Sequence, residues 1–560
     1  MTTFPERLNT LHARTPDRVA IYLQFSGSED IPITYDQLLQ SAGEYASALD
    51  RQGINPGEVV VLILQHGVDL IYSFWGAILH GAIPSIMPFL TEKLSPERYR
   101  ADLSALVSVT KPAAIITYPE FAAEVRAALK TGDSVRAVIT SDQIEGQTDL
   151  DIESLAGFSR TREAIVLLQH SSGTTGLQKG VALSHQAVFN QLHAYGKSLS
   201  LNENDVIVSW LPLYHDMGLI AGFIMPVLSG VPLVLMSPFD WVRAPYRLMH
   251  SISKYRGTLV WLPNFAYHFL AQKIRDRHIE EVNLSSLRAV INCSEPVRRE
   301  SHQAFYERFK NYGLKYAALQ TSYAMAENVF CVTQSLLGSV PTVDEIDRES
   351  FMVQRVAKGP LDGRPSMKMM SSGGPIENVK IKILDEHGQE LPEGTVGEIA
   401  IQSNCMLIGY YNRPDLSAKA FLDGWYLTGD YGYISNGEVF VSGRKKDMII
   451  VGGRNVYPQD LEMLTYEVPG VHAGRSVAFG MFDETQGTEE VVIIAEVDSE
   501  DTDEQQKVAD AIRLHVTKNS AIALRYVKVV GPKWILKTSS GKTARSANKE
   551  KFLKELEEAK

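Results

Sequence analysis

Cysteine is scarce in this sequence. Three residues of this type, Cys293, Cys331 and Cys405, occur among 560, and no two of them form a Cys-x-x-Cys pair. This spacing argues against a zinc ribbon and against a disulfide framework. Free thiols persist in a reducing compartment, so we expect a cytoplasmic protein.

Long apolar segments are almost absent. The exception runs from 219 to 236, carries no charged residue and reaches about the minimum length of a membrane span. Its Ser229-Gly230 pair, between Pro226 and Pro232, indicates a turn that separates a buried helix from a buried strand. We therefore predict a core segment and no stable insertion into a membrane. The segment 1–17 mixes charge with proline and lacks an apolar stretch, which argues against a targeting peptide.

Positive charge is not in excess either. Lysine and arginine total 55 against 66 aspartates and glutamates, which gives a net charge of −11. An acidic chain is a poor general binder of nucleic acid, so we expect no nucleic-acid partner. Hydrophobic residues make up 44% and charged residues 22%, as in ordinary globular proteins. This composition excludes the disordered and fibrous classes.

Short apolar runs alternate with helical segments through the first two-thirds of the chain. Runs of this kind, bounded by turn residues and separated by helices such as the one expected over 69–80, are typical of parallel strands covered on both faces. The sequence therefore predicts an α/β architecture of mostly parallel sheets. The runs are 59–64, 82–87, 113–118, 137–140, 164–169, 206–210, 231–236, 258–262 and 289–292.

The pattern changes after Gly373. Segments 379–384 and 397–402 alternate apolar and polar residues, and Asn436-Gly437 is a hairpin signal, so we predict a small antiparallel β region. Beyond Gly443 the chain is mixed, with a strand expected over 490–497, a helix over 503–518 and a Lys-rich end. We predict a large domain, 1–444, and a small α+β domain, 445–560.

The strongest local motif is Ser171-Ser-Gly-Thr-Thr-Gly-Leu-Gln-Lys-Gly180, which follows an apolar run. Such a loop offers backbone N–H groups and hydroxyls at close range, and Lys179 adds a cation, as phosphate binding requires. It is not a Walker A loop, because the two Gly-Lys-Ser/Thr sites of the chain, at Gly196 and Gly541, lack the upstream glycine. A flexible turn is the structural alternative.

Six further motifs follow this loop in order. Together the series resembles the adenylate-forming superfamily of acyl-CoA synthetases, peptide-synthetase adenylation domains and luciferases. The resemblance implies that a carboxylate attacks the α-phosphate of ATP, giving an acyl-adenylate and pyrophosphate. It also implies a small C-terminal domain that moves. The motifs are Trp210-Leu-Pro-Leu-Tyr-His-Asp-Met-Gly218, Asn292-Cys-Ser-Glu-Pro296, Gln320-Thr-Ser-Tyr-Ala-Met-Ala-Glu327, Tyr426-Leu-Thr-Gly-Asp430, Gly443-Arg-Lys-Lys-Asp-Met-Ile-Ile450 and Lys537-Thr-Ser-Ser-Gly-Lys542.

The same resemblance assigns the nucleotide site. Tyr323 would stack on adenine opposite Cys293 and Ser294, Asp430 would clamp the ribose, and Arg444 would contact the same sugar. Taken alone, Tyr323 would more often be a core residue and Asp430 a turn residue, and only the series of motifs favours the nucleotide roles. Glu327 would position Mg²⁺, because a hard cation prefers carboxylate oxygen. The residues implied for the ATP phosphates are Ser172, Gly173, Thr174, Thr175 and Lys179.

The resemblance also assigns the reacting groups, with Lys542, His215 and Glu327 as catalytic residues. Lys542 would bridge the carboxylate and the α-phosphate, and Lys446 would be the hinge about which the small domain turns. His215 would border the carboxylate and gate the acyl pocket; a general base is not needed, because the acid is already ionised at neutral pH. Met217, Ile220 and Phe265 are candidate pocket walls, although apolar residues there could simply be core.

Within the superfamily, four segments most resemble fatty acyl-AMP ligases. In these enzymes an insertion, expected here within 334–370, is associated with restricted domain motion and poor use of coenzyme A. They pass the acyl group to the phosphopantetheine arm of an acyl carrier protein. Ala324 and Gln178 depart from a common Gly and a common Pro. The segments are His215-Asp-Met-Gly-Leu-Ile220, Pro263-Asn-Phe-Ala-Tyr267, Ser294-Glu-Pro-Val297 and Gly453-Arg-Asn-Val-Tyr-Pro-Gln-Asp-Leu-Glu462.

Two alternatives stay open. One is a medium- or long-chain acyl-CoA ligase, which differs in the acceptor of the acyl group. The other is an inactive nucleotide-binding module, which the presence of Lys542, Asp430 and Glu327 disfavours. The acyl chain length does not follow from the sequence, because pocket depth depends on side chains from distant segments.

Overall fold

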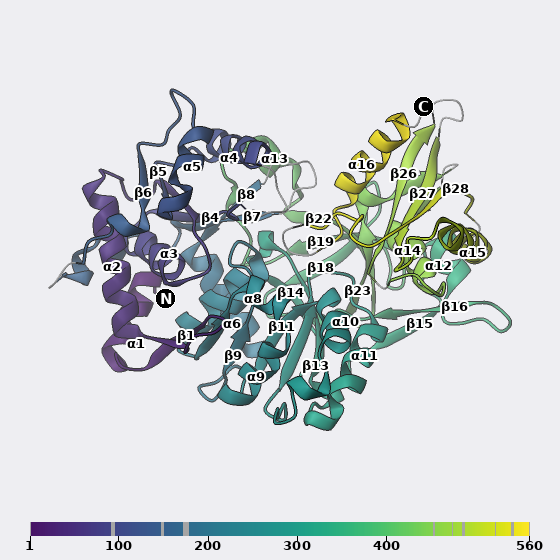
Figure 1. The fold of residues 1–560 in the computed structure, drawn as a ribbon, viewed down its shortest axis with the longest axis horizontal. Helices are drawn as coiled ribbons and strands as arrows, with labels where there is room; N and C mark the ends of the chain where they lie inside the picture. Colours follow the sequence, from purple (N-terminus) through teal and green to yellow (C-terminus); the bar gives the residue numbers. More distant parts are fainter. Residues whose placement is uncertain are drawn as a thin grey trace.

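The computed structural model describes residues 2–90, 96–146, 150–171, 179–451, 454–472, 474–483, 488–520, 522–538 and 542–558. Within these ranges the chain forms a large lobe built on two sheets and a smaller lobe formed by its C-terminal part (Figure 1). The α/β class predicted from the alternating apolar runs is confirmed. The boundary at 444/445 stays a prediction.

One sheet of the large lobe has nine strands, in the order β17-β14-β13-β12-β11-β9-β10-β1-β2. Neighbours from β13 to β1 run parallel, and antiparallel pairs add β2 at one edge and β14 with β17 at the other. The strands are β1 (Val19–Gln24), β2 (Ile31–Thr34), β9 (Ile207–Ser209), β10 (Leu233–Met236), β11 (Leu259–Pro263), β12 (Ala289–Cys293), β13 (Leu319–Ala324), β14 (Cys331–Gln334) and β17 (Gly374–Pro375).

The second sheet has seven strands, in the order β20-β8-β7-β4-β3-β5-β6. Its pairs are parallel from β7 to β6, but β8 runs antiparallel to both β7 and β20. The prediction of a parallel strand is thus right for the pairing of β7 with β4 and wrong for its pairing with β8. The strands are β3 (Val59–Ile63), β4 (Ile83–Ile86), β5 (Ala114–Thr117), β6 (Ala137–Thr140), β7 (Ile165–Ser171), β8 (Lys179–Ser184) and β20 (Gly409–Tyr410).

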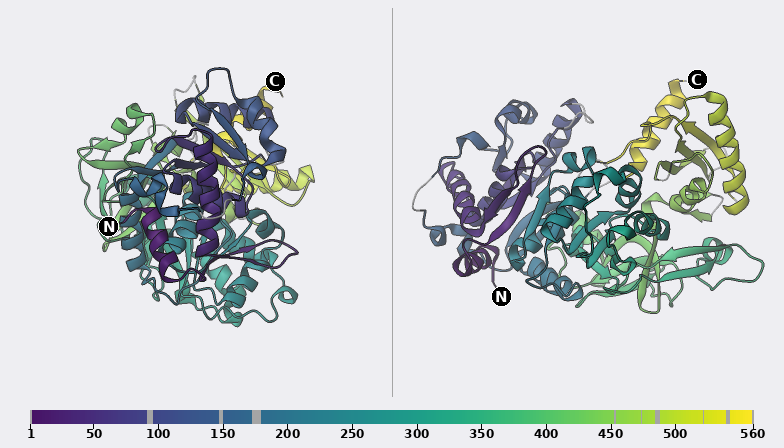
Figure 2. Two further views of the ribbon diagram at one scale, coloured as in Figure 1. Left: turned by 90° about the vertical axis from the view of Figure 1, so that its left-hand side faces the viewer. Right: turned by 60° about the horizontal axis from the view of Figure 1, so that its bottom comes forward.

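Helices cover these sheets (Figures 1 and 2). α2 illustrates the local cause: the Thr34 hydroxyl accepts from the Gln37 N–H at 3.2 Å, and the Gln37 side chain accepts from the Thr34 N–H at 3.0 Å. This capping box begins the helix. The helices of the large lobe are α1 (Phe4–Arg14), α2 (Tyr35–Arg51), α3 (Val68–His80), α4 (Pro96–Thr110), α5 (Ala122–Ala128), α6 (His185–Ser198), α7 (Met225–Ser229), α8 (Pro238–Arg243), α9 (Tyr246–Tyr255), α10 (Asn264–Lys273), α11 (Arg299–Phe309) and α13 (Pro414–Lys419).

The uncharged segment 219–236 lies in the core. A π-helical stretch, Met217–Ile224, continues into α7, and Gly230 turns the chain into β10 with a φ of +78°. Most of its side chains are buried. The prediction of a core segment with a Ser-Gly turn is confirmed. Across the described residues, no helix combines the length and apolarity that crossing a bilayer requires.

A small antiparallel sheet follows, as predicted. Its order is β18-β19-β22-β21, with β23 paired to β22. The β22–β23 turn is made by Asn436 and Gly437, both in the left-handed region with φ of +52° and +76°. The strands are β18 (Lys380–Leu384), β19 (Gly397–Gln402), β21 (Phe421–Leu422), β22 (Trp425–Ser435) and β23 (Glu438–Arg444).

The smaller lobe has its own apolar core around a three-stranded sheet, β26-β27-β28. A short 3₁₀ turn, Lys445–Asp447, links this lobe to β23. Its elements are β24 (Ile449–Val451), β25 (Arg454–Val456), α14 (Pro458–Tyr466), β26 (Ser476–Asp483), β27 (Thr488–Glu496), α15 (Thr502–Ser520), β28 (Leu524–Val530) and α16 (Arg545–Glu558).

Residues 335–372 form an excursion from the nine-stranded sheet. It contains a two-stranded sheet of β15 (Val343–Asp347) and β16 (Ser366–Met370) and the helix α12 (Arg348–Gln354). The excursion leaves after β14 and returns at β17, where Gln334 and Gly374 are paired. Gly373, with a φ of +86°, lies so close to the Gln334–Ser335 backbone that a Cβ would come within 2.1 Å of it. In Figure 1, β15 and β16 extend from the large lobe and lie below α12 in that view.

Candidate active site

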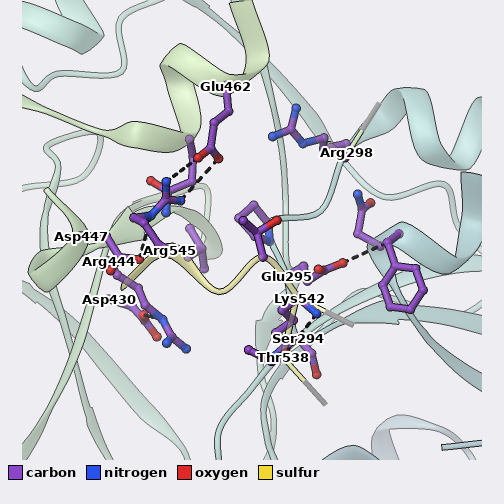
Figure 3. Close-up of a pocket in the computed structure, with 18 of the residues that line it drawn as sticks. Ser294, Glu295, Arg298, Asp430, Arg444, Asp447, Glu462, Thr538, Lys542 and Arg545 are labelled. Carbon is purple, nitrogen blue, oxygen red and sulfur yellow. Dashed lines mark hydrogen bonds and ion pairs between the residues drawn. The ribbon is translucent and has the colours of Figure 1, made fainter. Parts of the chain in front are cut away.

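A cleft of about 1750 Å³ lies between the two lobes. Residues of both lobes line it, and Figure 3 shows part of this lining. The phosphate-loop candidates Ser172, Gly173, Thr174 and Thr175 lie outside the described residues. The sequence-predicted residues that the cleft brings together are Lys179, His215, Phe265, Ser294, Tyr323, Glu327, Asp430, Arg444, Lys446 and Lys542.

Asp430 is held from two sides. It lies opposite Arg444 in the β22–β23 register, and the Arg444 Nε is 3.3 Å from Asp430 Oδ1. From β13, the Tyr323 hydroxyl donates to Asp430 Oδ2 at 2.6 Å. Burial, and then the Asp430 charge, raise the pKa of Tyr323 well above its usual value, so the hydroxyl remains a donor. The Asp430 carboxylate is thus held in one orientation by Tyr323 and Arg444.

Glu327 follows β13 in a buried turn, Ala326–Asn328. The Tyr410 hydroxyl donates to its Oε1 at 3.0 Å, and the Tyr410 and Tyr426 hydroxyls are 2.9 Å apart. The Lys179 Nζ lies 4.7 Å from the centre of the Tyr410 ring. Burial raises the pKa of Glu327, and the Tyr410 hydrogen bond and the Lys179 charge only partly oppose this. A cation bound here would therefore stabilise the ionised form of the Glu327 carboxylate.

His215 and Asp216 form a pair at the start of the π-helical stretch. His215 Nδ1 is 2.6 Å from Asp216 Oδ1, which also accepts from the Met217 N–H at 2.8 Å. Burial raises the pKa of Asp216, but His215 and Lys542 outweigh it and lower the value to about 2. Asp216 is therefore an anion that holds the His215 ring and faces the lysine.

Lys542 reaches the cleft from the small lobe. The Thr538 N–H donates to the Lys542 carbonyl at 2.7 Å, and the Lys542 N–H donates to the Thr538 hydroxyl at 3.2 Å. Figure 3 shows Lys542 beside Ser294 and Glu295 of the large lobe. Burial, and then the charge of Arg444, lower the pKa of Lys542, while Asp216 and Glu295 oppose that shift. Lys542 thus lines the cleft in this structure, together with Lys537 and Thr538.

The candidate acyl wall is only partly at the cleft. Phe265 lines it, its N–H donates to Glu295 Oε2 at 2.9 Å, and the Lys537 Nζ is 5.6 Å from its ring centre. Met217 is buried, and its sulfur accepts from the Ser294 hydroxyl at 3.7 Å. Ile220 is buried and is not among the lining residues. The role of all three as pocket walls stays a prediction.

Cys293 and Lys446 border the same region. Cys293 ends β12 and is fully buried, and burial raises the pKa of its thiol to about 12. Lys446 lies in the 3₁₀ turn between the lobes and lines the cleft; burial and the Arg444 charge lower its pKa. The position of Lys446 suits a hinge, and the hinge role stays a prediction.

Sequence reasoning missed Tyr410 and Asp216. Asp216 adjoins His215 within a motif, so its neighbour was the available signal. Tyr410 had no local signal, because its contact with Glu327 depends on β20 pairing with β8, where Gly409 faces Ala182. Both residues support a site residue through a buried hydrogen bond or ion pair.

The sequence profile of AMP-binding enzymes matches residues 9–411. The chain belongs to this family, which confirms the resemblance to adenylate-forming enzymes. Among curated relatives it is 30% identical to the long-chain-fatty-acid–AMP ligase FadD26 of Mycobacterium marinum, over 93% of this chain and 91% of the relative. It is 28% identical to the medium-chain-fatty-acid–[acyl-carrier-protein] ligase JamA of Moorena producens, over 97% and 93%.

Solved structures give the same picture. A structure from a study of fatty acyl-adenylate ligases of E. coli and L. pneumophila superposes with a TM-score of 0.90 at 25% identity, covering 100% of this chain and 99% of that one. A fatty acyl-adenylate ligase of L. pneumophila in complex with acyl adenylate and pyrophosphate superposes with a TM-score of 0.74 at 28% identity, covering 98% and 96%. The fold is therefore that of adenylate-forming enzymes.

Proposed function

We propose that this chain is a fatty acyl-AMP ligase. It activates a fatty acid with ATP and then passes the acyl group to the phosphopantetheine arm of an acyl carrier protein. The observation that carries the proposal is the meeting, in one cleft, of a lysine from the small lobe with the Asp430–Arg444–Tyr323 cluster and with Glu327. The names of the relatives support the choice of substrate.

In the first step a carboxylate oxygen of the acid attacks the α-phosphorus of ATP. The bond between the α-phosphorus and the oxygen that bridges to the β-phosphorus breaks. Acyl-adenylate forms and pyrophosphate leaves. The protein needs no nucleophile of its own; it has to hold two anions in line and neutralise charge. Lys542 would stabilise the charge that develops between the carboxylate and the α-phosphate, and Lys179 would hold the departing phosphates together with the loop before it.

The nucleoside would be held by Asp430, whose carboxylate can accept from both ribose hydroxyls, with Arg444 beside it. Tyr323 would contribute its ring to the adenine and its hydroxyl to Asp430. His215, held by Asp216, would border the fatty carboxylate next to the reacting oxygen. These roles are proposals for residues that the cleft brings together.

Mg²⁺ fits Glu327. Its carboxylate is buried, has a raised pKa and accepts from the neutral Tyr410 hydroxyl, so a divalent cation would stabilise the charged form. Among the described residues, no three His, Cys, Asp or Glu side chains cluster closely enough to cage a metal ion. Mg²⁺ is usually coordinated by one or two carboxylates together with substrate phosphates, so a cage of protein ligands is not required. Bound there, the ion would neutralise phosphate charge.

In the second step the thiol of the phosphopantetheine arm attacks the acyl carbon, AMP leaves, and the thiol proton passes to solvent.

The excursion supports a carrier protein over coenzyme A, because it contacts the small lobe. The Arg348 guanidinium donates to Asn519 Oδ1 at 3.2 Å, and Phe351 shares an apolar cluster with Tyr457. These contacts favour the arrangement with Lys542 in the cleft. We place the reaction in the cytoplasm, since all three cysteines are free and buried.

A two-part assay tests the proposal. Fatty-acid-dependent exchange of pyrophosphate into ATP reports adenylation, and mass spectrometry of acids from butanoate to hexadecanoate identifies the acyl-AMP. Thioester formation is then compared with saturating coenzyme A and with a loaded carrier protein. We expect exchange with a fatty acid and transfer to the carrier protein. Efficient acyl-CoA synthesis would instead favour the acyl-CoA ligase, and no exchange with any acid would leave a nucleotide-binding module.

A further inference from the structure

Arg545 contacts three segments beyond its own helix: α14, β26 and the turn that connects the lobes. It begins α16, and its guanidinium donates to both carboxylate oxygens of Glu462 in α14 and to the carbonyl of Ala478 in β26. Its Nε is also 3.6 Å from Asp447 Oδ2, in the turn that connects the lobes. The Arg545 side chain is 14% exposed, and those of Glu462 and Asp447 are 9% and 17% exposed. Figure 3 shows this cluster.

Within the small lobe, several contacts hold the Glu462 carboxylate in place. Glu462 Oε1 accepts from the Ala478 N–H at 2.8 Å as well as from Arg545, so the carboxylate is tied to α16 and β26 together. Paired guanidinium–carboxylate contacts fix orientation as well as distance, which a lysine cannot reproduce. The start of α16 is therefore held at a defined place in the small lobe.

The lysine loop is attached to that place. Lys542 lies three positions before Arg545, and the Ala544 N–H donates to the Leu536 carbonyl at 3.0 Å. Asn548 of α16 is fully buried; its side chain accepts from the Leu536 N–H at 2.8 Å and donates to the Leu536 carbonyl at 2.9 Å. Both described arms of the loop are thus fastened to the first turn of the helix that Arg545 holds.

Asp447 links this cluster, through the connecting turn, to Arg444 and Asp430, which are proposed to hold the ribose. Asp447 ends the 3₁₀ turn that begins directly after Arg444, and Arg444 pairs with Asp430. Two ion pairs, Asp430–Arg444 at 3.3 Å and Asp447–Arg545 at 3.6 Å, are therefore joined by the connecting turn, and the chain then runs from Arg545 back to Lys542. Of the two, the Asp447–Arg545 ion pair is the contact that joins the connecting turn to the lysine loop.

We propose that Arg545 is a positioning residue, which fixes Lys542 relative to the connecting turn so that closure of the small lobe delivers the lysine to one place. Arg545 lines the cleft, but the role proposed for it acts through Lys542 and requires no contact of Arg545 with nucleotide or acid. The inference rests on the proposed function, since that is where Lys542 is assigned to adenylation. If it holds, weakening the contacts of Arg545 misplaces the lysine without removing it, and the adenylation step alone suffers.

Two variants test this, with a matched control. Asp447→Asn removes the ion pair to the connecting turn and leaves the Arg545–Glu462 pair, and Arg545→Lys keeps the charge but loses the paired geometry. Arg525→Lys is the control, because its pair with Glu490, at 3.2 Å between β28 and β27, is in the same lobe but away from the cleft. Exchange of pyrophosphate and transfer from supplied acyl-AMP to a carrier protein are measured for each, with the melting temperature.

We expect kcat for exchange to fall about tenfold in Asp447→Asn and up to about a hundredfold in Arg545→Lys, the scale of a misplaced catalytic group. KM for ATP and for the acid, and the rate of transfer, should stay within about twofold of the control. Exchange equal to the control in both variants overturns the proposal. So does a parallel loss of both half-reactions with a lowered melting temperature, which a merely structural role gives. Absence of exchange in the unmodified protein counts against the proposed function instead.

Discussion

The two lobes hold their site residues in different ways. On the large lobe, Asp430, Tyr323 and Glu327 lie in or beside strands, and side-chain contacts of 2.6 to 3.3 Å hold each of them. On the small lobe, Lys542 is fixed in its loop through backbone and hydroxyl contacts with Thr538. The proposed nucleotide site is thus prearranged, whereas the position of the lysine depends on where the small lobe lies.

The largest effect should come from removing the delivered group. Lys542→Ala is expected to lower pyrophosphate exchange by about 10²–10³, the scale of one lost charge contact in the transition state. ATP binding and transfer from preformed acyl-AMP should change little, because the prearranged residues remain. Exchange at the unmodified rate would remove Lys542 from the mechanism.

Breaking the prearranged side should affect binding instead. Asp430→Ala leaves Tyr323 and Arg444 without their shared partner and removes the proposed ribose acceptor. A hydrogen bond to a charged group contributes about 1.5–3 kcal/mol, so KM for ATP should rise roughly tenfold to a hundredfold. Steady-state kinetics with varied ATP measure this. A KM for ATP within about twofold of the unmodified protein would make Asp430 a structural turn residue.

The contrast predicts that contacts which hold the small lobe control the acceptor. Shortening the excursion within about 340–364 removes Arg348 and its hydrogen bond to Asn519, together with Phe351 of the shared apolar cluster. Acyl-CoA output should then rise about fivefold to tenfold while adenylation is largely kept, since about 1.4 kcal/mol of lost preference is a tenfold shift in population. Pyrophosphate release and thioester formation with saturating coenzyme A are measured on one preparation.

The excursion contacts also permit a milder variant. Arg348→Ala removes the hydrogen bonds of Arg348 to Asn519 in α15 and to the Ser366 carbonyl, and it should move acyl-CoA output in the same direction by a smaller factor. Unchanged output in both variants would mean that the excursion does not restrain the small lobe.

The smallest effect concerns the lobe interface itself. Asp460, in the first turn of α14, is buried between Arg298 and Arg348, and burial raises its pKa to about 7 although both arginines oppose this. Its folded pKa exceeds the unfolded value, so its contribution to stability falls as pH rises from about 4 to about 7 and is constant above. Asp460→Asn should therefore raise the melting temperature by roughly 1–3 °C at about pH 8 and by less at about pH 5. An equal change at both pH values would contradict the shift.

Much of the fold could be predicted from local pattern. The run 137–140 coincides with β6 and 397–402 with β19, because apolar residues bounded by turns define a buried strand wherever it pairs. The Asn436-Gly437 hairpin follows from the φ values that those residues tolerate. The antiparallel partner of β7 could not be predicted, since burial on both faces fixes the composition of a strand and not its direction.

The candidate site divides in the same manner. The sequence motifs predicted the residues that would contact a ligand, because the motifs occur in a recognisable order along the chain. The supporting side chains were not predicted: Tyr410 reaches Glu327, and Arg545 reaches Glu462, across 83 positions in both cases. Contacts of this kind depend on how sheets and lobes pack, and no local spacing encodes them.

The neck of the excursion has a consequence for engineering. Its two ends are already neighbours, because Gln334 pairs with Gly374 and Gly373 lies against the Gln334–Ser335 backbone. A segment whose ends meet can change in length at little entropic cost, since loop closure depends only weakly on the number of residues enclosed. The 335–372 module is thus a natural grafting point, where a segment from another acid-activating enzyme could be exchanged without cutting a strand of the nine-stranded sheet.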